Sequence, residues 1–214
     1  MILARTGELR QLGSAIKDDD ATLVAFINLG LIEIYKRFVL KTDEAVLNLV
    51  DGKTIYKLDG TDPNVTLGND PFMYLISAYG QDVNATDYTP EDTIILPINV
   101  EDDINSINTI TYNEVQIPLV TTGALISLIY ASTPTKVTLD NLDQDLDIPD
   151  VFVEALLNYM GYRGHTSINE TGQSEDDLYY MKFEKSCNKV RELGVGVAPD
   201  DMSMNGRLSN RGFI

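Results

Sequence analysis

The chain has 214 residues, 43% of them hydrophobic, and a formal net charge of −17 at pH 7. A negative surplus of this size repels nucleic acids and anionic membranes, because both are themselves negatively charged. The single cysteine, Cys187, excludes an internal disulfide and any CxxC metal site.

Most of the negative surplus lies in the middle of the chain. Residues 61–148 contain fourteen acidic residues and one basic residue, Lys136, whereas the flanking segments are nearly balanced. The N-terminus shows no signal-peptide pattern, and the longest apolar run, residues 23–32, is shorter than the ~20 residues that span a bilayer. We therefore expect neither a secretory signal nor a membrane span.

Two helices are predicted before residue 48. Residues 6–16 carry leucine and isoleucine at helical spacing. Residues 22–40 are apolar nearly all round and follow an aspartate, Asp20, that is suited to cap a helix N-terminus. A helix of this kind is usually buried on two sides, and another subunit is one candidate for covering the second side.

The middle of the chain is rich in Val, Ile, Thr and Tyr, separated by Gly, Pro, Asn and Asp. This composition is typical of antiparallel strands. Six strands are predicted, at residues 54–58, 73–79, 93–98, 106–112, 125–131 and 136–139. Six short strands indicate a small barrel or sandwich.

Helical spacing returns at Pro149, a residue favoured in the first turn of a helix. A last helix runs to about Leu193, where Gly194 ends it. Three lysines form a stripe on this helix, away from its apolar positions, and we assign them as candidates for a subunit interface: Lys182, Lys185 and Lys189.

The predicted fold class is α+β. A helical bundle is built from N- and C-terminal helices and carries an inserted small antiparallel β-barrel or β-sandwich module. An extended C-terminal tail follows. The predicted segments are the N-terminal helices of the bundle (1–47), an acidic β-module (48–147), the C-terminal helices (148–194) and an extended docking tail (195–214).

The last segment is polar and rich in Gly and Asn, so it is not expected to fold alone. Its alternatives are a frayed terminus and an arm that binds a neighbouring chain. We favour the arm. Its candidate contact residues are the apolar and arginine side chains of its second half: Met202, Met204, Arg207, Leu208, Arg211, Phe213 and Ile214.

No residue pattern supports catalysis. The only histidine, His165, lies in a glycine-flanked segment, and no phosphate-binding or HExxH pattern occurs. No catalytic residue or cofactor is assigned, but a carboxylate-based hydrolase stays open because the acidic residues are many.

One segment resembles a calcium-binding loop. Asp143, Asp145, Asp147 and Glu154 match EF-hand positions, but Ile148 stands where the loop requires glycine. We interpret these aspartates as negative charge at the N-terminus of the following helix. Cation binding there stays open, and no metal site is assigned.

A run of motifs along most of the chain resembles the head-to-tail adaptor proteins of short-tailed bacteriophages, of the connector-ring or tail-tubular-A type. One departure is Asp59, where the resemblance leads us to expect proline. The motifs are residues 34–38 (IYKRF), 55–58 (IYKL), 96–99 (LPIN) with 101–103 (EDD), 129–134 (IYASTP), 148–149 (IP), the helix with Leu156 and Tyr159, and residues 211–213 (RGF).

The resemblance implies a non-enzymatic virion protein, assembled in the bacterial cytoplasm and forming a ring of about twelve copies. The ring would bind the portal protein and tail proteins and let DNA pass without specific binding, since an acidic wall lacks the lysines and arginines that hold phosphates. The lysine stripe would meet the acidic module of the next subunit. The alternatives are a ligand- or carbohydrate-binding β-module and another ring or tail component of the virion.

Overall fold

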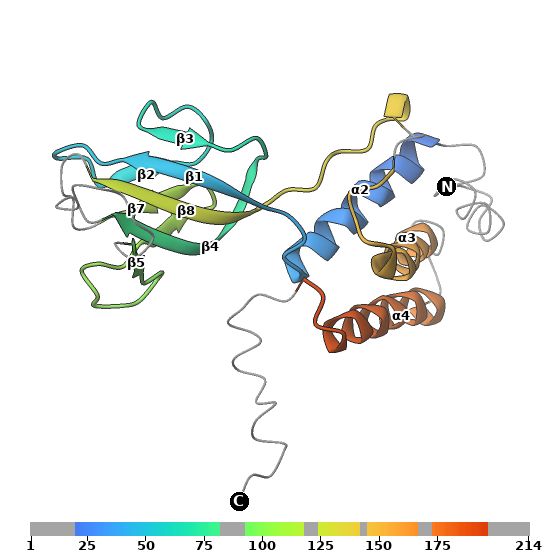
Figure 1. Cartoon of the computed structure of the whole chain (residues 1–214). Helices are drawn as coiled ribbons and strands as arrows, with labels where there is room; N and C mark the ends of the chain where they lie inside the picture. The colour runs from blue at the N-terminus through green and yellow to red at the C-terminus, as the bar shows by residue number, and fades with distance from the viewer. Residues whose placement is uncertain (1–19, 82–92, 118–123, 142–144, 167–172, 197–214) are drawn as a thin grey trace, which may run out of the picture. The chain divides into compact units, whose positions relative to one another are not determined.

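The computed structural model describes residues 20–81, 93–117, 124–141, 145–166 and 173–196. The chain forms two compact units, which we call the helical unit (residues 1–40 and 134–214) and the β unit (residues 41–133) (Figure 1). The described part contains three α-helices and two antiparallel sheets, which confirms the α+β class. Among the described helices, none combines the length and apolar character needed to cross a bilayer.

The helical unit contains α2 (Asp20–Arg37), α3 (Val153–Thr166) and α4 (Gln173–Glu192). Short 3-10 turns, η2 (Leu139–Asn141) and η3 (Asp150–Phe152), lie between α2 and α3 along the chain. All three helices were predicted, although α2 ends three residues earlier than expected. The prediction that Gly194 ends the last helix is confirmed, because its φ of 72° is in the left-handed region that favours glycine. The helix predicted at residues 6–16 lies outside the described residues.

The three helices bury one apolar core that includes Leu31, Ile34, Leu156 and Phe183. Helix α3 packs against both α2 and α4. The α2–α3 approach is close at Gly30, where an added Cβ would lie 2.5 Å from Cδ1 of Leu156. A larger residue at position 30 would therefore displace the Leu156 side chain from its place in the core.

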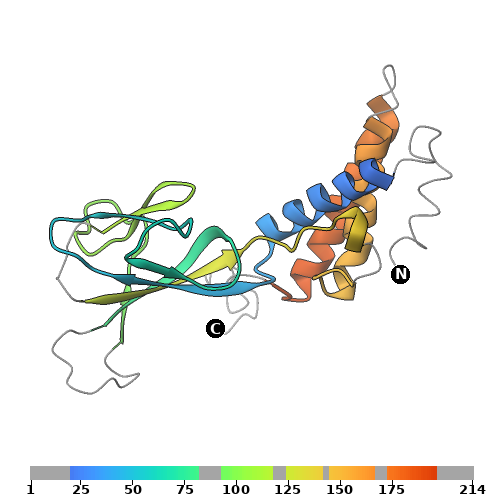
Figure 2. The same ribbon diagram turned by 90° about the horizontal axis from the view of Figure 1, so that it is seen from above.

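The second side of α2 is covered by the chain's own strap, which we define as residues 134–141 and 145–148 (Figure 2). The side chain of Asn28 binds the backbone of Val137 twice: its amide donates to the carbonyl and its oxygen accepts from the N–H, each at 2.9 Å. One heptad further along α2, the Tyr35 hydroxyl donates to the Asp147 carbonyl at 2.6 Å. No second subunit is needed to bury this side.

The strand predicted at residues 136–139 is wrong, because this segment pairs with α2 and not with a sheet. Its alternating Val and Thr residues favour extended backbone, and the segment has no helix until η2 begins at Leu139. Its hydrogen-bonding partner is the side-chain amide of Asn28 on a helix, however, and not another strand. The strap therefore belongs to the helical unit.

The β unit contains a five-stranded sheet in the order β3-β1-β8-β4-β5 and a three-stranded sheet in the order β2-β7-β6, all antiparallel. Of the two predicted alternatives, barrel or sandwich, the barrel is wrong, because within the described residues the strands form two separate sheets and neither sheet closes on itself. The strands are β1 (Thr42–Asn48), β2 (Ile55–Lys57), β3 (Val65–Leu67), β4 (Phe72–Gln81), β5 (Thr93–Leu96), β6 (Asn108–Thr111), β7 (Glu114–Gln116) and β8 (Leu125–Ser132).

Both sheets contribute to one apolar core. Leu47 and Leu128 come from the larger sheet, and Tyr56 and Val115 come from the smaller one. Five of the six predicted strands are present, with ends shifted by up to two residues, whereas β1, β3 and β7 were not predicted. The first and last strands of the unit, β1 and β8, pair side by side over their whole length, so the chain enters and leaves the β unit at neighbouring positions.

Candidate assembly surfaces

The charge of the β unit is almost entirely negative and is not compensated within the unit. Residues 41–133 contain fourteen acidic residues and three lysines. Each lysine lies within ion-pair distance of a carboxylate of the same unit, which weakens its attraction for an external phosphate. The pairs are Lys41–Asp70 at 2.9 Å, Lys53–Asp62 at 2.5 Å and Lys57–Glu114 at 3.8 Å.

Two carboxylates are held in the charged form by their surroundings. Hydrogen bonds from the backbone N–H groups of Asp70 and Glu44 lower the pKa of Asp43. Burial alone would raise the pKa of Asp62, but bonds from Lys53 and from nearby backbone N–H groups outweigh it and lower the pKa. Both groups therefore keep their negative charge well into the acidic range.

The acidic loop, residues 99–105, is held by hydrogen bonds at both ends. The Asn99 N–H donates to the Ile107 carbonyl at 3.0 Å, and the Asn99 side chain accepts from the Thr109 N–H at 2.8 Å. The buried Ser106 hydroxyl accepts from the Val100 N–H at 2.9 Å. These bonds hold the backbone of the loop at its two ends.

The backbone of the acidic loop includes two residues in the left-handed region, Asn99 with φ 51° and Asp102 with φ 66°. Asn and Asp tolerate this conformation better than most residues. The turn exposes two large apolar side chains, Val100 at 46% and Ile104 at 61% of their surface. They lie in sequence among the exposed carboxylates of Glu101 and Asp102, which makes a mixed apolar and acidic surface.

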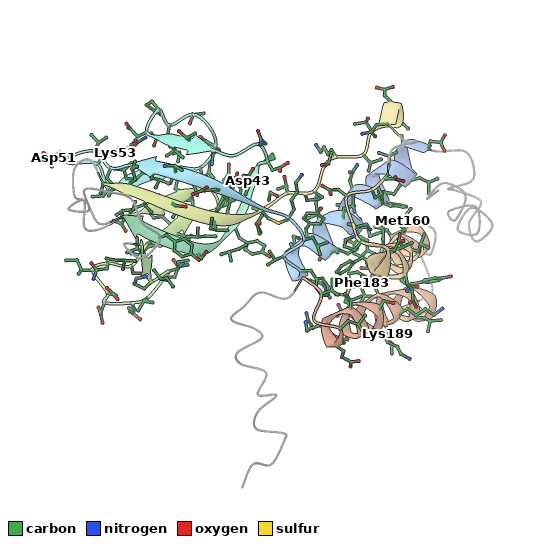
Figure 3. All side chains as sticks on the ribbon, viewed as in Figure 1. Asp43, Asp51, Lys53, Met160, Phe183 and Lys189 are labelled. Carbon is green, nitrogen blue, oxygen red and sulfur yellow. The ribbon has the colours of Figure 1, made fainter. Side chains whose placement is uncertain are left out.

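The outer face of α4 carries the opposite charge. Lys182, Lys185 and Lys189, the lysines assigned from the sequence, are all exposed. Helical spacing places two large apolar residues on the same face: Leu178, 48% exposed, and Met181, 67% exposed. We call these five residues the α4 stripe. Phe183 lies on a different side of the helix from Lys189 (Figure 3) and is buried in the core.

The lysines of the α4 stripe have few partners within the described part of the chain. Lys189 lies 3.9 Å from a carboxylate oxygen of Glu154, with both side chains largely exposed. The Lys182 ammonium lies 4.9 Å from the ring centre of Tyr179. Lys185 makes no ion pair with a described residue. Exposed pairs of this kind contribute little to stability, so the stripe is available for a partner.

The inner side of α4, by contrast, satisfies its charges internally. Nη1 of Arg37 on α2 lies 2.8 Å from a carboxylate oxygen of Glu184, and the guanidinium lies 4.7 Å from the ring centre of Phe183. The thiol of Cys187 is buried on this side, and burial raises its pKa to about 11. A thiol in this state is a poor nucleophile at neutral pH.

The predicted tail contact residues, 202–214, all lie outside the described residues. The last described position, Gly196, accepts a hydrogen bond from the Val39 N–H at 2.6 Å. Its φ of 65° and its approach to Phe38 and Leu40 leave no room for a side chain. The tail therefore starts from a fixed point at the C-terminal end of α2.

The positions tested for chemistry are not brought together. Asp143 lies outside the described residues, as does the side chain of His165. Glu154 faces Lys189, and within the described part no three metal-ligating side chains cluster.

Sequence reasoning found the lysines but missed the apolar members of both surfaces. Leu178 and Met181 precede Lys185 by seven and four residues, so the spacing that identified the lysine stripe was sufficient to include them. For Val100 and Ile104 there was no such signal, because their exposure depends on the turn geometry at Asn99 and Asp102.

Comparison with known families gives one match. A family model described as SU10 adaptor protein matches residues 4–207 of the chain. No curated protein matches the chain.

Proposed function

This chain belongs to the SU10 adaptor protein family, a family of phage head-to-tail adaptors, and we propose that copies of it form a ring between the portal and the tail of a virion. The match over residues 4–207 is the observation that carries this proposal. It confirms the resemblance to head-to-tail adaptors that the sequence motifs indicated. The role is structural: the protein binds other virion components, and the ring, of about twelve copies, leaves a channel for DNA.

The charges of the β unit support passage of DNA without specific binding. Protein binds DNA mainly by placing Lys and Arg against phosphates and releasing counterions. The three lysines of the β unit already bind carboxylates of the same unit. A ring wall made from this unit repels DNA whatever the base sequence of the DNA.

The docking-tail proposal applies to residues 195–214. Gly196 is fixed next to Val39, so the residues after it start from a defined position on the helical unit. An extended chain covers up to ~3.5 Å per residue, so eighteen residues reach about 60 Å. The tail binds the portal or a neighbouring copy, with Phe213 as its apolar anchor and Arg207 and Arg211 pairing with acidic residues.

Electron-microscopic class averaging of the protein mixed with its candidate portal ring tests this function. The chain is compared at full length and truncated after Gly196. Truncation at this point keeps the bond from Val39 to Gly196, so the helical unit is left intact. We expect the full-length protein to add a ring to the portal and the truncated protein to add it weakly or not at all.

The outcomes separate the parts of the proposal. A stacked ring that does not depend on truncation keeps the adaptor role and removes the docking arm. Full-length protein that stays monomeric and ignores the portal contradicts the adaptor role, and glycan binding by the β unit is then the next function to measure. A second truncated variant that ends after Asn205 keeps Met202 and Met204 but removes residues 206–214, which include Arg207, Arg211 and Phe213. It is expected to bind as weakly as the shorter variant if these residues anchor the tail.

A further inference from the structure

We propose that the acidic loop of one copy binds the α4 stripe of a neighbouring copy, and that this contact joins the subunits of the ring. The inference rests on the proposed ring function and adds to it the two surfaces that meet. The occupant of each surface is thus a second copy of the same chain.

Charge complementarity is the first argument. The β unit has fourteen acidic residues and three lysines, all three already paired. The α4 stripe carries three lysines on one helix face, and within the described residues Lys185 has no ion pair. Opposite charges in this arrangement speed association and exclude contacts between like surfaces.

The acidic loop is the best match to the stripe within the described part of the β unit, because it combines carboxylates with apolar side chains. Val100 and Ile104 are 46% and 61% exposed, and Glu101 and Asp102 lie between them in the sequence. The α4 stripe has the same composition with the opposite charge, since Leu178 and Met181 precede the lysines. The apolar groups supply the energy of burial, whereas the charges select the partner.

The fixed backbone of the acidic loop is the second argument. Two non-glycine residues of the loop, Asn99 and Asp102, have positive φ. The Asn99 N–H donates to the Ile107 carbonyl, and the neighbouring Val100 N–H donates to the buried Ser106 hydroxyl. Conformations of this kind persist where surrounding structure holds them, and they concentrate at functional sites. A rigid loop loses little entropy on binding, which suits a contact repeated in every copy.

The contact is heterologous, because two different surfaces of the chain meet. Each copy therefore offers one loop and one stripe, and contacts continue from copy to copy until the ring closes. A symmetric dimer would use both surfaces of both copies and stop there. The ring of the proposed function thus requires the kind of contact that these two surfaces provide.

A mixing experiment with two full-length variants tests the contact. The first, the stripe variant, carries Lys182→Glu and Lys185→Glu. The second, the loop variant, carries Glu101→Lys and Asp102→Asn, in which Asn keeps the left-handed backbone at position 102. Mass photometry and electron microscopy measure ring formation as the protein concentration is raised.

We expect each variant alone to need at least about tenfold more protein than wild type for half-maximal assembly, because like charges then face each other. An equal mixture restores assembly when the two variants alternate: the altered stripe of each stripe variant then meets the altered loop of one neighbour, and its unaltered loop meets the unaltered stripe of the other neighbour. The mixed rings alternate and contain an even number of copies. Assembly of wild type weakens as salt is raised, because exposed charges are screened.

Matched controls carry Lys136→Glu or Asp51→Lys, exposed charges outside both surfaces, and circular dichroism verifies that every variant is folded. Variants that assemble like wild type, or mixtures that show no restoration, overturn the proposed contact while the adaptor role stands. Wild type that forms no ring, alone or on a portal, overturns the ring function itself, and the contact with it.

Discussion

The bond between Asn28 and the strap leads to a prediction about stability. Asn28→Ala removes both partners of the Val137 backbone, the donor to its carbonyl and the acceptor from its N–H, each now at 2.9 Å. Val137 is 9% exposed, so water reaches these groups poorly once the amide is gone. An unsatisfied buried backbone group costs about 1–3 kcal/mol.

Two such groups, partly relieved by relaxation of the strap, give an expected loss of about 2–3 kcal/mol in the free energy of unfolding. The better helix propensity of alanine returns about 0.5 kcal/mol of this. Asn28→Asp keeps an acceptor for the N–H but places a carboxylate against the Val137 carbonyl, so it is expected to be at least as destabilising.

Urea denaturation followed by circular dichroism at 222 nm measures the effect, because this signal comes mainly from the three helices. Asn188→Ala is the matched control: it removes an exposed asparagine on α4 that binds Arg191 on the surface. We expect the control to stay within about 0.5 kcal/mol of wild type. If Asn28→Ala behaves like this control, the strap is not held by the amide and the reasoning is wrong.

Three further predictions concern single groups. Gly68→Ala places a Cβ 2.0–2.2 Å from the Asp43 carboxylate, and thermal denaturation should show the β unit losing about 1–3 kcal/mol. Because the pKa of Asp62 is lowered in the folded state, its charged form adds to the free energy of unfolding. This contribution is complete above about pH 4 and is lost as the pH falls through the folded-state pKa. On acid titration, Asp62→Asn should therefore lose less stability than wild type. Cys187, with its pKa raised to about 11, should react with Ellman's reagent only when the protein is unfolded, and rapid reaction of native protein would contradict its burial.

The helices were predictable because each buries a stripe that repeats at helical spacing. On α4, Phe183, Cys187 and Val190 are all buried, as their spacing indicated. The core of the β unit follows the period-two pattern in the same way, with Ile126, Leu128 and Tyr130 buried on β8.

The missed elements depend on partners that are distant in sequence. Strand β1 contains two acidic residues, which are rare in strands; in the structure Asp43 accepts backbone bonds and Glu44 accepts a bond from Ser127. Strands β3 and β7 have three residues each, which gives only a weak period; β2 is as short, but Ile and Tyr residues mark it. Part of the strap was predicted as a strand, because its local sequence does not show whether its backbone pairs with a side chain or with another strand.

The two assembly surfaces also differ in whether the sequence predicts them. Helical spacing alone identified Lys182, Lys185 and Lys189, because a helix face is a local property. The acidic loop was read as a solvated turn, since its shape depends on positive φ at two residues and on the buried Ser106. No pattern in the sequence marks such a turn as rigid.

The insertion of the β unit between α2 and α3 has a consequence during synthesis on the ribosome. Helix α2 emerges first, but α3, α4 and the strap that cover it follow only after the 93 residues 41–133. At ~5–20 residues per second, translation leaves α2 without partners for about 5–20 s. The β unit is complete before then, so it folds first and holds its own first and last strands, β1 and β8, side by side. Nascent chains stalled before residue 150 should therefore bind chaperones through the apolar surface of α2.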